Sequence, residues 1–210
     1  MIRPYEQSDL ARMREICLLT GAAGGDATGL FSSDDLLPDL FLEPYVTFAP
    51  GWAWVVELPV PNGAGQDGVQ VEGYLVAVSD TRAFTSWWAD TWTPWFATLY
   101  PRPQQPYSEE ERLVLRGYHP GQIEIAEVDE YPAHLHVDLL PAAQGQGWGS
   151  KLIGRLRSEL ADVGVPGVYA SLDAENVAAP GFYERIGFTE LPSSTPEGLV
   201  YGVATREERV

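Results

Sequence analysis

The chain has 210 residues, a net charge of −17 at neutral pH and one cysteine, Cys17. An acidic balance of this size disfavours nucleic acids and anionic membranes as partners, because both require basic surface. It favours a cationic substrate, and the alternative, which we prefer, is that it serves solubility alone. With no apolar stretch long enough to span a bilayer, no signal-peptide pattern and no cysteine pair, we expect a single domain over residues 1–210 in the cytoplasm.

Hydrophobic periodicity predicts strands and helices in alternation along the chain. The predicted strands are 1–6, 51–58, 71–80, 133–141, 167–173 and 198–205. The predicted helices are 9–19, with Ser8 as its cap, then 32–42, 108–118, 147–164 and 176–187. Residues 59–68 read as an exposed hairpin loop, and the tryptophans of 81–107 as one side of a helix packed on the sheet. The expected fold class is α/β or α+β with a mixed sheet.

A glycine-rich stretch, "QGQGWG" at 144–149, leads from a strand into a helix. The free backbone N–H groups at such a helix start attract anions, and glycine lets a phosphate come close, so we interpret the stretch as a diphosphate site. Lys151, Arg155 and Arg157 add positive charge nearby. The P-loop pattern is absent, and a dinucleotide pattern starting at Gly145 fails because Ser150 stands where glycine is needed.

The same stretch resembles the Q/R-x-x-G-x-G/A pattern of the GNAT superfamily of acetyl-CoA-dependent N-acetyltransferases. A second GNAT motif, N-x-x-A-x-x-x-Y-x-x-x-G-F, is matched downstream by Asn176, Ala179, Tyr183, Gly187 and Phe188. The opening "IRPYEQSDLARM" also resembles the first strand and helix of that family. The resemblance implies a GNAT fold, with a mostly antiparallel twisted sheet flanked by helices.

A narrower resemblance links the chain to bacterial stand-alone relatives of the acetyltransferase-like C-terminal domain of O-GlcNAcase. It is carried by "IRPY", by Trp92, Pro94 and Tyr100 of "WTPWFATLY", and by Asp138. The eukaryotic domain lacks the glycine loop and is regarded as a pseudo-acetyltransferase. The loop is present here, which favours retained binding of the co-substrate.

The GNAT resemblance implies acetyl-CoA as co-substrate, with no metal. The backbone at Leu139 would pair with the pantetheine arm, the loop would cradle the pyrophosphate, and Asn176 and Phe182 would contact the far end of the pantetheine. The implied cofactor-binding residues are Leu139, Gln144, Gly145, Gln146, Gly147, Trp148, Gly149, Ser150, Asn176 and Phe182.

Acetyl transfer to an amine needs positioning, a base for the ammonium and an acid for the leaving thiolate. Tyr183 occupies the family's general-acid position, and Asp138 could accept a proton or anchor a cation. The catalytic residues that we expect are Tyr183, Asp138 and Asn176. Asp173 and Glu175 are weaker candidates, and we expect Cys17 to pack in the core.

Two further groups of polar residues come before or within the strand at 133–141. The acidic run of Glu124, Glu127, Asp129 and Glu130 is typical of a solvated face. His134 and His136 share a strand face with Asp138, an arrangement more suited to a base than to a metal, since a fourth strong ligand is missing.

The acceptor site is the least defined part of the sequence. We expect Trp87, Trp88 and Asp138 to contact the substrate, because aromatic side chains hold cations well. The predicted function is acetyl transfer to the primary amine of a small molecule or a protein, with a homodimer possible. The alternative is a non-catalytic acyl-CoA-binding sensor or interaction module.

Overall fold

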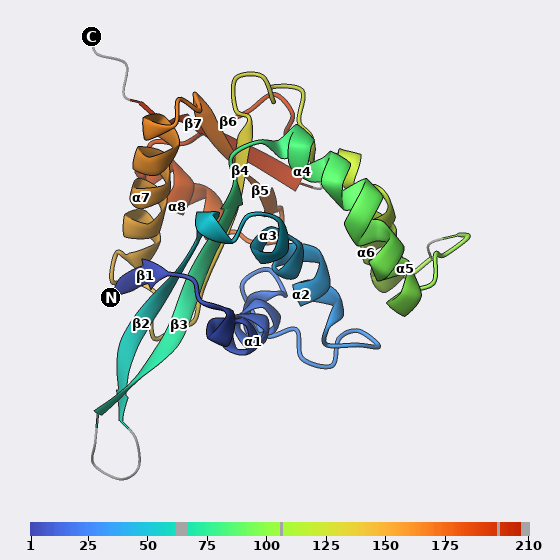
Figure 1. Ribbon diagram of the computed structural model, residues 1–210, viewed down its shortest axis with the longest axis horizontal. Helices are drawn as coiled ribbons and strands as arrows, with labels where there is room; N and C mark the ends of the chain where they lie inside the picture. The colour runs from blue at the N-terminus through green and yellow to red at the C-terminus, as the bar shows by residue number, and fades with distance from the viewer. Residues whose placement is uncertain (62–66, 106, 197, 207–210) are drawn as a thin grey trace.

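One seven-stranded sheet runs through the protein in the order β1-β2-β3-β4-β5-β7-β6 (Figure 1). The computed structural model describes residues 1–61, 67–105, 107–196 and 198–206. The strands are β1 (Ile2–Pro4), β2 (Ala53–Pro61), β3 (Asp67–Val78), β4 (Ala133–Leu139), β5 (Gly167–Asp173), β6 (Thr189–Glu190) and β7 (Gly198–Ala204). All neighbours are antiparallel except β4 and β5, which are parallel. The predicted mixed, mostly antiparallel sheet is confirmed.

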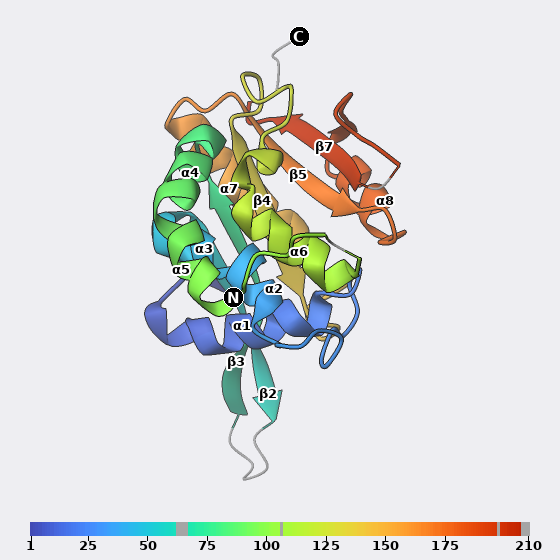
Figure 2. The same ribbon diagram turned by 90° about the vertical axis from the view of Figure 1, so that its right-hand side faces the viewer.

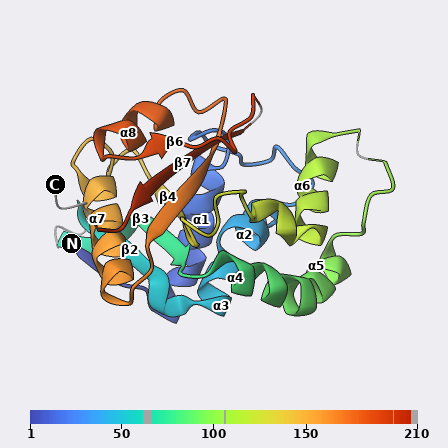
Figure 3. The same ribbon diagram turned by 90° about the horizontal axis from the view of Figure 1, so that it is seen from above.

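Helices cover both faces of the sheet. They are α1 (Leu10–Thr20), α2 (Leu36–Phe41), α3 (Glu43–Phe48), α4 (Thr81–Trp87), α5 (Thr93–Leu99), α6 (Glu109–Tyr118), α7 (Trp148–Asp162) and α8 (Ala179–Arg185), with short 3-10 turns between some of them. α7 and α8 lie on one face, and α1 to α6 lie towards the other, with α5 and α6 farthest from α7 (Figures 1 and 3).

The alternation of side chains along β3 and β4 divides the core into two hydrophobic layers. Tyr74 and Val76 join the layer under α1 to α6, whereas Leu75 and Leu135 join the layer under α7 and α8. α7 buries Leu152, Ile153, Leu156 and Leu160, spaced three and four residues apart, against this second layer. Successive residues of one strand therefore point to opposite faces of the sheet and pack against different helices.

The start of α1 differs from the prediction in its cap. The chain first makes a 3-10 turn at Gln7–Asp9, in which the Asp9 carboxylate accepts the amide of Glu6 at 2.8 Å. Asp9 also pairs with Arg3 on β1 at 2.7 Å. The N-cap of α1 is Asp9, so the predicted Ser8 cap is wrong. The ion pair with Arg3 ties this helix start to the sheet.

The hairpin between β2 and β3 is longer than the sequence indicates. The predicted loop covered 59–68, yet residues 59–61 and 67–68 pair as strand, and this hairpin projects from the molecule (Figure 2). The rest of that predicted loop, 62–66, lies outside the described residues. The two-residue strand β6 was not predicted.

The tryptophan-rich segment is helical, as predicted, but it is not one regular helix. α4 begins at the N-cap Asp80, whose side chain accepts the amide of Ala83, and a π-helical turn over Trp88–Trp92 leads into α5. Trp88 and Trp92 are buried, while Trp95 is 39% exposed. The wider π turn rotates the later residues, which explains why the tryptophans do not all face the sheet. Within the described chain no helix is long and apolar enough to cross a membrane.

Candidate active site

The central feature of the site is the divergence of β4 from β5. The two parallel strands pair only at Ala133↔Val168 and His134↔Tyr169. Beyond that point β4 continues beside β3, and β5 continues beside β7. A cleft of about 670 Å³ opens between the separated strands, with the loop after β4, the start of α7, and α8 as its other walls.

The backbone of β4 offers hydrogen-bonding groups to this cleft. Leu140 donates its amide to the carbonyl of Glu72 at the β3 side, at 2.9 Å. Because successive residues of a strand point their backbone groups to opposite sides, Leu139 faces the cleft. Its carbonyl accepts the side-chain amide of Gln144 at 2.8 Å.

The glycine loop reaches α7 through left-handed backbone. Gly145 has φ of 70° and Gly147, the N-cap of α7, has φ of 78°. Side chains other than glycine rarely adopt this conformation, which is why the sequence places glycine at both positions. The amides of residues 145–150 donate to no acceptor within the described chain. They form a row of free N–H groups at a helix start, the geometry that binds anions.

The third glycine has a packing role that the sequence did not indicate. A Cβ on Gly149 would lie 3.0 Å from Cζ of Phe182. Glycine therefore lets α8 approach the start of α7. Gly145 and Gly147, by contrast, have open space where a Cβ would be, so their glycines are required by φ.

The two glutamines of the loop close turns with their side chains. Gln144 lines the cleft, and Gln146 donates its side-chain amide to the carbonyl of Ala142 at 2.5 Å. The side chain of Gln146 thus braces the loop, whereas Trp148 and Ser150 line the cleft. The Nζ atom of Lys151 lies 4.4 Å from the centre of the Trp148 ring.

The cations predicted to surround the loop are placed differently. Arg155 pairs with Glu159 at 2.8 Å, and Arg157 donates to the carbonyl of Ala204 at 3.0 Å. Neither lines the cleft, because both project from other sides of α7. The cleft is lined instead by Arg185 at the end of α8, which the sequence analysis missed.

The second motif brings three predicted residues to the cleft. Asn176, Phe182 and Tyr183 all line it. Tyr183 is 5% exposed and packs edge-on against Phe182 and Phe188. Burial raises the pKa of the Tyr183 phenol, so it carries its proton at neutral pH.

Asp138 lines the cleft from the opposite face of the sheet. Its carboxylate accepts the hydroxyl of Tyr74 at 2.5 Å. Burial is the largest influence on the Asp138 carboxyl and raises its pKa, although the Tyr74 hydrogen bond acts the other way. Asp138 and Tyr183 therefore line the same cleft from opposite faces of the sheet.

The two histidines form a buried hydrogen-bonded chain with Tyr45 of α3. The Tyr45 hydroxyl lies 2.8 Å from Nε2 of His134 and 3.0 Å from Nε2 of His136. These residues border a second, smaller hollow of about 60 Å³, which shares Leu135, His136 and Ser171 with the cleft.

The loop after α1 also reaches the cleft, and the sequence analysis missed this. Thr20, Ala23 and Gly24 line it, with Ala23 in left-handed backbone at φ of 50°. The glycine cluster "TGAAGG" was a usable signal, since it marks a tight turn with left-handed residues.

The two tryptophans that we predicted to bind substrate lie in different surroundings. Trp88 borders the smaller hollow and donates its indole N–H to the carbonyl of Gly117 at 3.1 Å. Trp87 packs against Phe48, Phe84 and Trp92 and borders neither the cleft nor the hollow, so its position does not support substrate contact.

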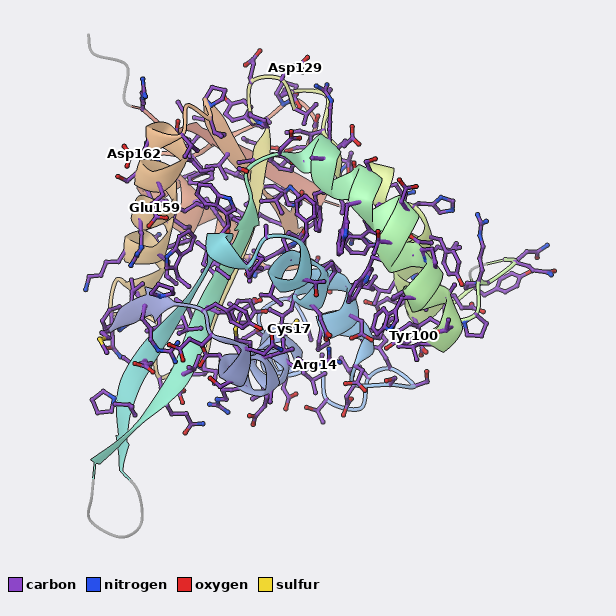
Figure 4. All side chains as sticks on the ribbon, viewed as in Figure 1. Arg14, Cys17, Tyr100, Asp129, Glu159 and Asp162 are labelled. Carbon is purple, nitrogen blue, oxygen red and sulfur yellow. The ribbon has the colours of Figure 1, made fainter. Side chains whose placement is uncertain are left out.

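The remaining acidic candidates lie mostly away from the cleft. Glu124 accepts a hydrogen bond from the hydroxyl of Thr85. Asp129 pairs with Arg82 and lies in a loop at the end of the molecule far from Cys17 and α1 (Figure 4). The other two acids of that run, Glu127 and Glu130, and also Glu175, are not among the residues that line the cleft or the hollow, whereas Asp173 lines the cleft.

Cys17 lies on α1, is buried in the core and has a free thiol, as predicted. Within the described residues, no group of three or more His, Cys, Asp or Glu side chains is arranged to hold a metal ion.

Comparison with known proteins identifies the family. The family model "Acetyltransferase (GNAT) domain" matches residues 108–190. The crystal structure of SsHAT is 34% identical in sequence, with 99% of this chain and 98% of that one covered and a TM-score of 0.87. The chain belongs to the GNAT acetyltransferase family.

Two more distant structures share the GNAT fold. One is yncA from Salmonella typhimurium with its cofactor acetyl-CoA, at 16% identity, a TM-score of 0.52, and 100% of this chain and 96% of that chain covered. The other is a phosphinothricin acetyltransferase from Sinorhizobium meliloti in complex with acetyl-CoA, at 14% identity, a TM-score of 0.52, and coverage of 97% and 87%.

The likeness to SsHAT also supports the narrower resemblance to the O-GlcNAcase-type branch of GNAT proteins. It extends over nearly all of both chains, including the middle of this one, where few residues carried that resemblance.

Proposed function

We propose that the protein is an acetyl-CoA-dependent N-acetyltransferase that moves acetyl to a primary amine by direct attack. The observation that carries this proposal is the cleft between β4 and β5, which ends at a row of six backbone amides without an acceptor among the described residues. A phosphorylated co-substrate with an amide-containing arm suits both parts of this cleft.

The binding roles follow from the walls of the cleft. The amides of 145–150 would hold the pyrophosphate, and Leu139 would pair with the pantetheine arm through its cleft-facing backbone. Phe182 and Asn176 would contact the arm from the side of α8. The two GNAT structures that contain acetyl-CoA support this co-substrate.

Tyr183 is the proposed general acid. Its raised pKa keeps the phenol protonated, and its position in the cleft wall allows it to donate that proton to the departing thiolate. Asp138 would attract the cationic amine from the other face of the sheet. The small second hollow favours a compact acceptor over a peptide.

A calorimetric titration with acetyl-CoA, and separately with CoA, tests the binding half of the proposal. We expect micromolar affinity for both ligands. Release of free thiol from acetyl-CoA in the presence of a panel of amines then tests transfer. Binding without thiol release on any amine would favour the alternative, an acyl-CoA sensor, and the absence of binding would overturn both.

A cytoplasmic location remains part of the proposal, supported by the free thiol of the one cysteine.

A further inference from the structure

The smaller hollow is positioned where an acceptor would meet the co-substrate. It joins the cleft at Leu135, His136 and Ser171, beside the point where β4 and β5 separate. Its other walls come from α2, α3, α6, the π turn after α4 and the segment that follows α6. Its volume of about 60 Å³ holds roughly four water molecules, enough for a few heavy atoms.

Arg116 on α6 supplies a positive charge to this hollow. Its guanidinium lies 5.3 Å above the ring of Phe41, and no described residue accepts a hydrogen bond from it or forms an ion pair with it. Among the described residues, five arginines pair with carboxylates: Arg3, Arg12, Arg14, Arg82 and Arg155. Arg116 is one of the six described arginines that do not, and it is the one of those six that borders the hollow. Arg116 is exposed, and its guanidinium at the hollow can hold a planar anion such as a carboxylate in place of water.

The hydrogen-bonded chain at the junction fixes the tautomer of His136. Thr81 donates its single hydroxyl hydrogen to the carbonyl of Pro132 at 2.8 Å, so its oxygen accepts from Nδ1 of His134 at 2.7 Å. Nε2 of His134 must then accept the Tyr45 hydroxyl, and the Tyr45 oxygen accepts from Nε2 of His136.

This assignment leaves Nδ1 as a lone-pair acceptor on His136, a residue that lines both spaces. The edge of the His136 ring also packs against Phe41, at 5.7 Å between ring centres, which adds to the constraint on its orientation. Burial, with Arg116 as a further influence, lowers the pKa of His136 to about 4, so the imidazole is neutral at pH 7. A neutral imidazole with a free lone pair accepts a hydrogen bond from an ammonium group; because its low pKa makes it a weak base, it holds the proton only in passing.

We propose that this hollow is the acceptor site and that the acceptor is a compact amine with its own carboxylate, held by Arg116 with its nitrogen beside Nδ1 of His136. This inference rests on the proposed function. The ammonium loses one proton to Nδ1 of His136, and the freed amine nitrogen bonds to the acetyl carbon while the C–S bond breaks. Tyr183 protonates the thiolate, the second proton lost by the nitrogen restores Tyr183, and His136 returns its proton to water.

Matched amines test the inference on the unmodified protein. Glycine and methylamine differ by one carboxylate, as do alanine and ethylamine. With saturating acetyl-CoA, we expect kcat/KM from thiol release to be at least about 10-fold higher for the carboxylate member of each pair, since a charged hydrogen bond is gained.

Substitution of Arg116 supplies the second measurement. We expect Arg116→Gln to lower kcat/KM for glycine about 10- to 100-fold and to bring the ratio between paired amines towards one. Arg112→Gln is the matched control, because Arg112 is an exposed arginine on the same helix that borders neither the cleft nor the hollow. Thermal melting of each variant checks that it is folded.

The outcomes separate the inference from the function on which it rests. Equal rates within the amine pairs, or equal effects of Arg116→Gln and Arg112→Gln, would overturn the carboxylate acceptor while thiol release still supported acetyl transfer. Acetyl-CoA binding without turnover on any amine would overturn the transferase itself, and the acceptor site with it.

Discussion

The cleft and the hollow meet at the same three residues but are built in different ways. The cleft is walled largely by backbone and by residues close together in sequence, from the end of β4 to α8. The hollow is walled by side chains from distant segments, among them Phe41, Trp88, Arg116 and His136. A site built from backbone depends on local conformation, which the positions of the glycines in the sequence indicate. A site built from side chains depends on how helices distant in sequence pack together.

The most severe disruption of the backbone site should come from Gly147→Val. A β-branched residue is strained at φ of 78°, and its side chain would occupy the space beside the free amides. We expect acetyl-CoA affinity to fall about 100- to 1,000-fold, measured by calorimetry, since a strained residue costs about 1–3 kcal/mol before any steric block of the anion. Unchanged affinity would remove the loop from the site.

The side-chain site, the hollow, should make the free energy of unfolding depend on pH through His136. The pKa of His136 is about 4 in the folded protein, and an unfolded histidine titrates near 6.5. Between these values the unfolded chain binds the extra proton, so this histidine's contribution to the free energy of unfolding falls as pH drops from about 6.5 to 4. The loss approaches about 3 kcal/mol at the lower limit.

Denaturant unfolding of the unmodified protein and of His136→Gln, at pH 7 and at pH 4.5, measures this loss. The variant should lose less stability than the unmodified protein over the same interval. Parallel losses in both proteins would show that His136 is not held neutral by the fold.

Tyr183→Phe tests the chemical step at the point where the cleft supplies a side chain. Removal of the phenol hydroxyl leaves the packing against Phe182 and Phe188 in place. We expect kcat to fall about 100-fold while acetyl-CoA affinity is unchanged, because general-acid catalysis is lost and binding is not. An equal kcat would exclude Tyr183 as the acid.

The smallest expected effect is that of Gly154→Ala, which serves as the control for Gly147. Gly154 lies in the middle of α7 with open space around its missing Cβ. Alanine there should raise the free energy of unfolding by about 0.5–1 kcal/mol, because it favours helix. Acetyl-CoA affinity should stay the same, which shows that the effect of Gly147→Val belongs to the loop.

The same contrast explains what the sequence could predict. The glycines at 145 and 147 and the motif from Asn176 to Phe188 are local patterns that can be read from the sequence. In the structure, Asn176, Phe182 and Tyr183 line the same cleft as the glycine loop. The strand at 167–173 was predicted with its observed bounds, because its hydrophobic run is bounded by glycine and a charged turn.

The hollow could not be predicted in this way. Arg116 follows no motif, and its pairing with Phe41 depends on how α6 packs beside α2. Trp87 and Trp88 are neighbours of the same type that point in different directions from the helix, and the packing of α4 decides that Trp88 borders the hollow. The pairing of Arg155 with Glu159 is different in kind, because it is an i,i+4 contact within α7 that the helical spacing of the sequence already allows.

The divergence of β4 from β5 has a consequence for the order of events in turnover. The gap passes between two strands, so it is reached from both faces of the sheet: Tyr183 belongs to the layer of α7 and α8, whereas His136 packs against Tyr45 and Phe41 in the other layer. With the co-substrate in the cleft and the acceptor in the hollow, as proposed, the two substrates can be present together. Initial-rate plots at several fixed concentrations of each substrate should therefore give intersecting lines, the pattern of a ternary complex, and not the parallel lines of a ping-pong cycle.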